Sequence, residues 1–303
     1  MKETFNFTPK LMMNTMRILS LIFLSLFFIQ CSSDDNSNNN NNNDPNDPNP
    51  TNLPKLVAFE VGPNGTNVQY EYNDNDLLEV WTETTQPGVG FEITTAYNDE
   101  LNPNVWYYVD SEGVSDQKGF FYDFQGRVFR YLDAQDDVTL VYDNDNDTVL
   151  FEGIIDEVAD VSGSMTLNAG GKVTRFNGPN QYLTFDYDTS GNMIALNQYD
   201  NNDNLINNYS FTYDNKNNPF YGQFDALYLV RTIDLFWDFS NINFTGFSGY
   251  VYPYNPNNMT AILLDGITMV NYLIGYDNDD YPAVISEAVS GNSYQWDIIY
   301  ITE

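Results

Sequence analysis

The sequence predicts an all-β protein, an up-and-down antiparallel meander of hairpins in a strongly curved or barrel-like sheet. A short unit recurs along the chain: a tyrosine, then Asp or Asn, then two or three small polar residues, then an aliphatic residue. Between the units, apolar and polar residues alternate with period two, which is typical of strands with one buried face. After residue 31, no stretch keeps a helical period over three turns.

Residues 1–30 have the pattern of a signal peptide. Lys2, Lys10 and Arg17 precede an apolar run, Ile18 to Ile29, in which only Ser20 and Ser25 are polar. A membrane-spanning helix needs about 20 residues, so this run is too short for one, but it matches the apolar core of a secretory signal. We therefore expect the chain to be exported.

Cys31, the only cysteine, follows the apolar run after a single glutamine. The arrangement resembles the lipobox of bacterial lipoproteins, which implies cleavage before Cys31 and a palmitate-type anchor of three acyl chains in the outer membrane. Each buried CH₂ contributes about 0.8 kcal/mol, so several chains hold a protein stably on a bilayer. The alternative is an ordinary or uncleaved signal followed by an incidental cysteine.

The next residues are expected to be exposed. Ser32 to Asp35 resembles a short tag that sends lipoproteins to the cell surface in some Gram-negative bacteria; otherwise the protein would face the periplasm. Residues 31–53 are rich in Asn and Pro, which cannot build a core, so we expect a disordered tether. Residues 54–303 are long enough for one sizeable all-β domain.

The recurring unit has the chemistry of a hairpin tip. Asp or Asn after the tyrosine can accept a hydrogen bond from the backbone N–H two residues on, and Gly or Asn three or four positions after the tyrosine tolerates a positive φ. The unit therefore predicts a turn and not a repeated binding site. Copies begin at Tyr72, Tyr122, Tyr142, Tyr187, Tyr199 and Tyr213, with looser copies at Tyr254 and Tyr276 and one without tyrosine at Leu167.

The flanking residues indicate which side chains are buried. Leu183, Phe185 and Tyr187 share one strand face, and the same alternation predicts shared faces for the sets Leu205, Tyr209, Phe211 and Tyr213; Val270, Tyr272, Ile274 and Tyr276; and Tyr294, Trp296, Ile298 and Tyr300. We expect the tyrosine before each turn to pack its ring inward, with its hydroxyl near water at the rim.

The units YDTSGNMI, YDNNDNLI and YDNKNNPF, with YDNDDYPAVI near the C-terminus, resemble YD-repeat (RHS-like) secreted lipoproteins of unknown function. The resemblance covers residues 182–303 well and 54–181 loosely. It implies a porin-like, strongly curved antiparallel sheet, and it implies no catalytic residues.

The charge excludes one class of partner. The net charge is −32, and removal of residues 1–30 leaves −34. Such a chain is repelled by nucleic acid and by anionic headgroups. We therefore expect no nucleic-acid partner, and as partners the outer membrane through the lipid anchor and an unknown envelope protein or glycan.

Common catalytic machinery is absent from the sequence. There is no histidine, which excludes Ser/His/Asp and Cys/His triads and most zinc sites. Two carboxylates about 5–10 Å apart could hydrolyse a glycoside. Candidates outside the turns are Glu79, Glu83, Glu92, Glu152 and Glu157. We expect these to be solvated surface charges and the protein not to be an enzyme.

Calcium is the one metal that the sequence suggests, and no other cofactor is expected. Asp143, Asp145 and Asp147 have the 1-3-5 spacing of calcium ligands, but Thr148 and Ile154 stand where an EF-hand needs Gly and Glu. A hairpin tip is the better interpretation. Weak cation binding there, or at Asp277, Asp279 and Asp280, is a secondary hypothesis.

Aromatic residues suggest a possible ligand. Trp106 and Trp237 lie in the densest aromatic clusters and are candidate glycan contacts, although core packing is the more common role of such residues. We therefore expect a non-catalytic binding or scaffolding role at the outer membrane. The alternative is a carbohydrate-binding module or a carboxylate-dependent glycan hydrolase at the cell surface.

Overall fold

The computed structural model describes residues 55–86, 88–143, 145–219, 221, 225–239, 254–289 and 291–301. The expected signal peptide, Cys31 and the tether lie outside these residues. Among the described residues, no helix is long and apolar enough to cross a membrane.

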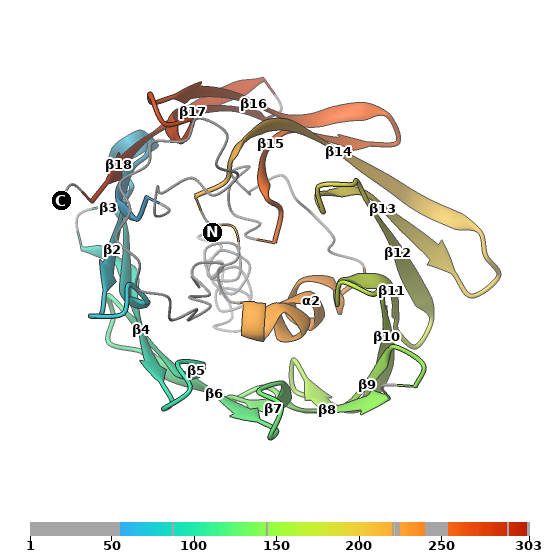
Figure 1. Ribbon diagram of the computed structural model, residues 1–303. Coiled ribbons are helices and arrows are strands. Elements are labelled where there is room, and N and C mark those ends of the chain that lie inside the picture. The colour runs from blue at the N-terminus through green and yellow to red at the C-terminus, as the bar shows by residue number, and fades with distance from the viewer. Residues whose placement is uncertain are drawn as a thin grey trace, which may run out of the picture.

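The fold is a closed antiparallel barrel of 18 strands, which confirms the predicted fold class. Successive strands pair along the chain, and β18 pairs with β1 to close the ring (Figure 1). The strands are β1 (Val57–Val61), β2 (Asn67–Tyr72), β3 (Leu78–Gln86), β4 (Val89–Tyr97), β5 (Pro103–Asp110), β6 (Ser115–Tyr122), β7 (Val128–Leu132), β8 (Asp137–Asp143), β9 (Thr148–Ile155), β10 (Val158–Leu167), β11 (Val173–Asn177), β12 (Gln181–Tyr187), β13 (Met193–Asp200), β14 (Leu205–Asn217), β15 (Asn257–Leu264), β16 (Ile267–Tyr276), β17 (Pro282–Val289) and β18 (Asn292–Tyr300).

The recurring unit turns the chain as the sequence predicted. In the turn after Tyr187, the Asp188 side chain accepts hydrogen bonds from the backbone N–H groups of Ser190 and Asn192. The fourth residue after the tyrosine, Gly191, has φ 92°. The same Asx bonds recur at Asn73, Asn98, Asp123, Asn168, Asp200 and Asp277.

The predicted position of the tyrosine hydroxyls is wrong. Most of the rings pack against the core, but their hydroxyls donate to backbone carbonyls. Tyr276 instead donates to the Asp214 carboxylate, and Tyr199 stacks on Tyr182 outside the core cluster. Tyr97, at the end of β4, bonds to the carbonyl oxygen of Leu78 at the start of β3, and so fastens the open end of that hairpin. The same bond is made by Tyr72, Tyr122, Tyr142, Tyr187, Tyr213 and Tyr300. Tyrosine recurs because burial of its hydroxyl requires a partner and the neighbouring strand supplies one.

Three predicted positions differ. Tyr213 does not precede a hairpin tip, because β14 continues to Asn217, and Tyr254 lies buried at the entry to β15. Leu205 lies an even number of residues before buried Tyr209, so the alternation predicts that both face the core, but Leu205 is exposed. The reason is a register shift in the pairing of β13 with β14 next to Leu205. The other predicted strand faces are confirmed.

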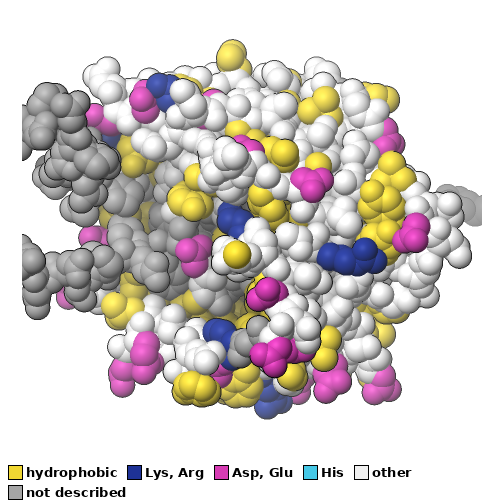
Figure 2. Space-filling view, turned by 45° about the vertical axis from the view of Figure 1, so that its right-hand side comes forward, with side chains coloured by type: hydrophobic (Ala, Val, Ile, Leu, Met, Phe, Trp, Pro, Cys, Tyr) yellow, Lys and Arg dark blue, Asp and Glu magenta, His cyan; other side chains and the backbone are white. Residues whose placement is uncertain are grey.

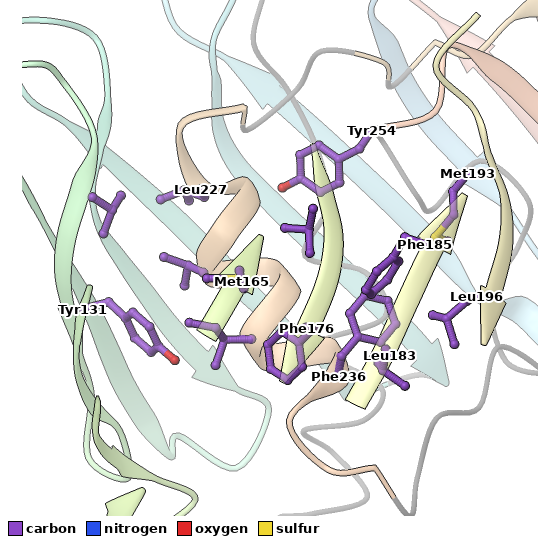
Figure 3. Packing of buried hydrophobic residues seen from close by; sticks show 14 of the residues in the cluster. Tyr131, Met165, Phe176, Leu183, Phe185, Met193, Leu196, Leu227, Phe236 and Tyr254 are labelled. Carbon is purple, nitrogen blue, oxygen red and sulfur yellow. The ribbon is translucent and has the colours of Figure 1, made fainter. Parts of the chain in front are cut away.

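Between β14 and β15 the chain enters the barrel. The short 3-10 helix η2 (Asp225–Leu227) leads into helix α2 (Tyr228–Phe236), which lies inside the ring of strands (Figure 1). Val230, Ile233 and Phe236 are buried at intervals of three, the spacing of one helix face. Figure 3 shows Phe236 beside Phe185 of the wall, and their ring centroids are 5.2 Å apart. The interior is therefore a packed core where α2 lies.

Ion pairs also fasten α2 to the wall. Lys118 of β6 lies 3.1 Å from Asp234 of α2 and 3.2 Å from Asp136 in the β7–β8 turn. Burial alone would lower the pKa of Lys118, but the charges of the surrounding carboxylates raise it above its usual value. The ammonium is thus charged and pairs the helix with the barrel wall.

Candidate functional site

The outer wall of the barrel carries both polar and apolar side chains. Side chains that point outward alternate with the buried ones, and in β7, β8 and β9 the residues Arg130, Thr139 and Glu152 lie side by side on the outer face. Other outward polar residues in mid-strand include Gln69, Glu92, Asp186, Asn197, Gln295 and Asp297. In Figure 2 the hydrophobic side chains on the visible face are scattered among polar ones. Apolar residues are exposed among them, including the paired Val141 and Leu150 and also Leu273 and Ile299. The wall is therefore mixed, with charged groups at mid-strand positions.

One groove interrupts this wall, with a volume of about 350 Å³. It lies at the rim between the β4–β5 turn and the neighbouring β6–β7 turn, and it is lined from both. The two turns lie side by side because strands that run up and down bring every second turn to the same rim. Both belong to the set of Tyr-Asx turns described above.

Three exposed phenylalanines form the apolar mouth of the groove, and Phe120 and Tyr122 also line it. Phe124, at the tip of the β6–β7 turn, is 95% exposed. Phe121 of β6 and Phe129 of β7 are partly exposed, with ring centroids 6.5 Å apart. Gly126, at φ 76°, closes the turn in a conformation that suits glycine. The local turn chemistry thus holds an apolar ring in water at the mouth of the groove.

Amides and carboxylates form the polar part. Asn102, Asn104 and Glu100 line the groove, and within the described part of the chain their side chains make no hydrogen bond to protein atoms. The side chain of Asn98 differs, because its oxygen accepts the N–H groups of its own turn. Amides both donate and accept hydrogen bonds, so the groove offers both to a ligand.

Asp123 is occupied by its own turn. Its carboxylate accepts bonds from Nε and Nη2 of Arg127 at 2.9 and 2.7 Å, and the guanidinium lies 4.0 Å from the ring centroid of Tyr142. Burial acts to raise the pKa of Asp123, but the bonds from Arg127 and the backbone lower it below its usual value. Asp123 is therefore ionised near neutral pH and cannot serve there as a general acid.

The two tryptophans singled out from the sequence lie elsewhere. Trp106 is 3% exposed and packs edge-on against Phe120, with ring centroids 4.7 Å apart. Trp237, at the end of α2, is half-buried and packs edge-on against Phe151 at 5.8 Å. Both contribute to packing in the barrel interior, which is the more common role of tryptophan in aromatic-rich strands.

The acidic residues proposed as cation ligands bond within their own turns or pair with lysine side chains. Asp143 accepts the backbone N–H of Asp145 and the side-chain amide of Asn146, as a turn residue does. Lys55 lies within ion-pair distance of Asp277 and Asp279, and Lys216 pairs with Asp280. Within the described ranges, no three acidic side chains gather as they would around a metal ion.

Of the five candidate glutamates, only Glu83 is buried. Glu79, Glu92, Glu152 and Glu157 are exposed. Glu83 faces the interior from β3 at 2% exposure, and Glu60 of β1 lies on the same row, with Val68 between them in register. Burial, with a smaller contribution from the charge of Glu60, raises the pKa of Glu83 to about 7. This carboxyl lies apart from the groove.

The sequence analysis missed the groove, although it contained a signal. In the copy at Tyr122, YDFQGRV, a phenylalanine stands where the other full copies carry Asp, Asn or Thr. A large apolar ring at the tip of a turn is the signal that could have indicated a ligand.

Comparison with known proteins gives no family. No protein-family model matches the chain, and no curated protein matches it. Among solved structures, a porin-like protein from Bacteroides uniformis ATCC 8492 matches with 14% identity over 82% of this chain and 98% of that one, at a TM-score of 0.43. A porin-like protein from Bacteroides vulgatus ATCC 8482 matches with 10% identity over 82% and 100%, at 0.32.

A chain of the Photorhabdus luminescens Tc holotoxin pore also matches, with 13% identity over 76% of this chain but 9% of that one, at a TM-score of 0.20. All three TM-scores lie below 0.5. The function proposed below therefore rests on the residues of this chain.

Proposed function

We propose that this protein is a lipid-anchored envelope protein of the YD-repeat type with a non-catalytic binding role, and that the groove on its outer wall is the binding site. The observation that carries the proposal is the exposure of Phe124 beside the side-chain amides of Asn102 and Asn104, which bond to no protein atom among the residues that the structure describes. Concave sites that combine apolar rings with a few polar groups are typical of small-molecule binding.

The anchor is proposed from the sequence. An apolar run of signal-peptide length ends just before the only cysteine, and residues 32–53 contain nothing that builds a core. Acyl chains on Cys31 would hold the barrel at the outer membrane, and the tether would separate it from the lipid.

Charged residues at the middle of the outer wall support a barrel that stands in water and not in the bilayer. A barrel that crosses a membrane needs an apolar outward band about 25 Å tall, and an Arg at the midplane costs about 2–4 kcal/mol. Here the outward mid-strand positions carry the charged residues Arg130, Glu152 and Asp297, which stand among exposed apolar residues such as Val141, Leu150 and Leu273.

A binding role is favoured over hydrolysis. Glycoside hydrolysis requires one carboxyl with a raised pKa to act as acid. In the groove, the bonds from Arg127 keep the pKa of Asp123 low. Glu83 has a raised pKa but is buried inside the barrel.

Protease treatment of intact cells tests the location. We expect peptides from residues 54–303 to be released from cells, and the Cys31→Ala variant to leave the membrane fraction. The surface location is wrong if these peptides appear only after lysis, and the anchor is wrong if Cys31→Ala stays membrane-bound. Retention on isolated cell envelopes tests the groove: we expect Phe124→Ala to lose it and Phe59→Ala, an exposed phenylalanine on β1, to keep it.

A further inference from the structure

We infer that the groove between the β4–β5 and β6–β7 turns binds an uncharged segment of a glycan, with Phe124 as the stacking platform and Asn102, Asn104 and Glu100 as hydroxyl partners. The inference rests on the proposed function, since it names the ligand of the same site. Shape, donor and acceptor chemistry, and charge each support it.

The apolar part of the groove suits a sugar ring. A pyranose presents a flat face of C–H groups, and an exposed phenylalanine offers a matching flat apolar surface. Phe124 projects from a turn tip at 95% exposure, so almost all of its ring is free to make this contact. Phe121 and Phe129 add two tilted rings from the adjacent strands.

The polar part suits hydroxyl groups. Each sugar hydroxyl both donates and accepts a hydrogen bond, and the amides of Asn102 and Asn104 do the same from neighbouring positions. The Glu100 carboxylate adds an acceptor. A purely apolar ligand would leave these three groups without partners once water is displaced, which is unfavourable.

The charge of the groove selects against acidic ligands. Its two carboxylates, Glu100 and Asp123, lie near two cations that are already paired: Arg127 with Asp123, and Arg130, 5.9 Å from the Phe121 ring centroid, with Asp137. The chain as a whole carries a net charge of −32. An anionic polysaccharide would meet repulsion both at long range and at Glu100, whereas a neutral one would not.

The size of the groove limits the segment that it holds. Its volume of about 350 Å³ lies at the small end of the range of about 300–1,000 Å³ for small-molecule sites. Since the groove lies on the outer wall at the rim, a longer chain could continue beyond it in both directions. The ligand is therefore a short stretch of a polysaccharide or a small oligosaccharide.

The test is calorimetric titration of the folded protein with neutral oligosaccharides and with uronic-acid or sulfated oligosaccharides of the same length. We expect a neutral oligosaccharide to bind, Phe124→Ala to weaken it at least tenfold, and the control Phe59→Ala to leave it unchanged. We expect Glu100→Lys to bind acidic oligosaccharides that the wild type rejects. Near-ultraviolet circular dichroism checks that each variant is folded.

Three results would overturn the inference: no binding of any neutral oligosaccharide, tighter binding of acidic ones by the wild type, or equal affinity of Phe124→Ala and wild type. If neutral sugars fail while retention on cell envelopes still depends on Phe124, the groove binds another ligand and the proposed function stands. If Phe124 has no effect on retention either, the groove is not the binding site and both proposals fail.

Discussion

The inner and outer walls of the barrel are made by alternate residues of the same strands, yet they differ in how their polar groups are used. On the inner wall, Lys118 is surrounded by carboxylates and the tyrosine hydroxyls are bonded to carbonyl groups. On the outer wall, polar side chains face water, and those of Asn102 and Asn104 border an exposed ring. The comparison indicates that inner-wall residues determine stability and that the outer wall is free to carry binding.

Loss of Lys118 is the strongest test of the inner wall. Lys118→Met removes the cation that buried Asp136 and Asp234 share and leaves Asp234 the longer pair with Arg231 at 3.5 Å. Breaking a buried ion pair costs about 3–5 kcal/mol. The measurement is the free energy of unfolding in urea. The control is Lys216→Met, which breaks a more exposed pair with Asp280 and should cost at most about 1 kcal/mol. Equal losses in the two variants would contradict the ion-pair account of α2.

Replacement of Glu83, a buried carboxyl of the inner wall, should change how the stability of the protein depends on pH. The folded state holds the proton of Glu83 more tightly than the unfolded state, because its pKa rises from 4.5 to about 7 on folding. Stability from this group is therefore present below pH 4.5 and is lost as pH rises toward 7, by about 3 kcal/mol.

We expect Glu83→Gln to remove this part of the pH dependence, measured as unfolding free energies from pH 4.5 to 7.5. The control Glu79→Gln changes an exposed carboxylate on the same strand and should retain the wild-type slope. Identical slopes for wild type and Glu83→Gln would show that Glu83 is not buried as described.

The tyrosine bonds should each have a smaller effect. Tyr122→Phe removes the hydroxyl that donates to the Pro103 carbonyl oxygen at 2.6 Å, and we expect a loss of about 1 kcal/mol in urea unfolding. Tyr107→Phe, on the exposed side of β5, should change stability by less than about 0.5 kcal/mol. If both variants unfold alike, the hydroxyl bond does not explain why tyrosine recurs.

Phe124→Ala should have the smallest effect on stability. Its ring is exposed and contributes little to the core, so we expect a change within about 0.5 kcal/mol in the same assay. The glycan titration described above should nevertheless lose affinity. A large loss of stability would instead mean that Phe124 packs against the protein, and the groove would lose its platform.

The architecture was predictable because its signals are local. The turn at Tyr187 follows from Asp188 and Gly191, which lie within four residues of it, and the alternation around Phe185 fixes its buried face. The inward path of α2 was not predictable. Its nine residues are too short to display a sustained helical period, and their burial depends on the barrel that surrounds them.

The candidate site was harder to predict because it joins residues from two turns. Asn102 and Phe124 come together through the pairing of β5 with β6, which brings the two turns to one rim. Trp106 shows the opposite case. As a tryptophan it was a candidate sugar contact, but it stands at a position of β5 whose side chain points into the core. Residue type alone does not separate these cases, whereas the face of the strand does.

The measurement that tests the account most directly is the behaviour of a chain beginning at residue 54 in detergent-free buffer and at planar lipid bilayers. If the packed core lies inside the barrel and the charged outer wall faces water, this chain should be monodisperse, should unfold cooperatively in urea and should produce no conductance across the bilayer. A chain that stays soluble only in detergent, or that inserts and conducts ions, would contradict the assignment of the two walls.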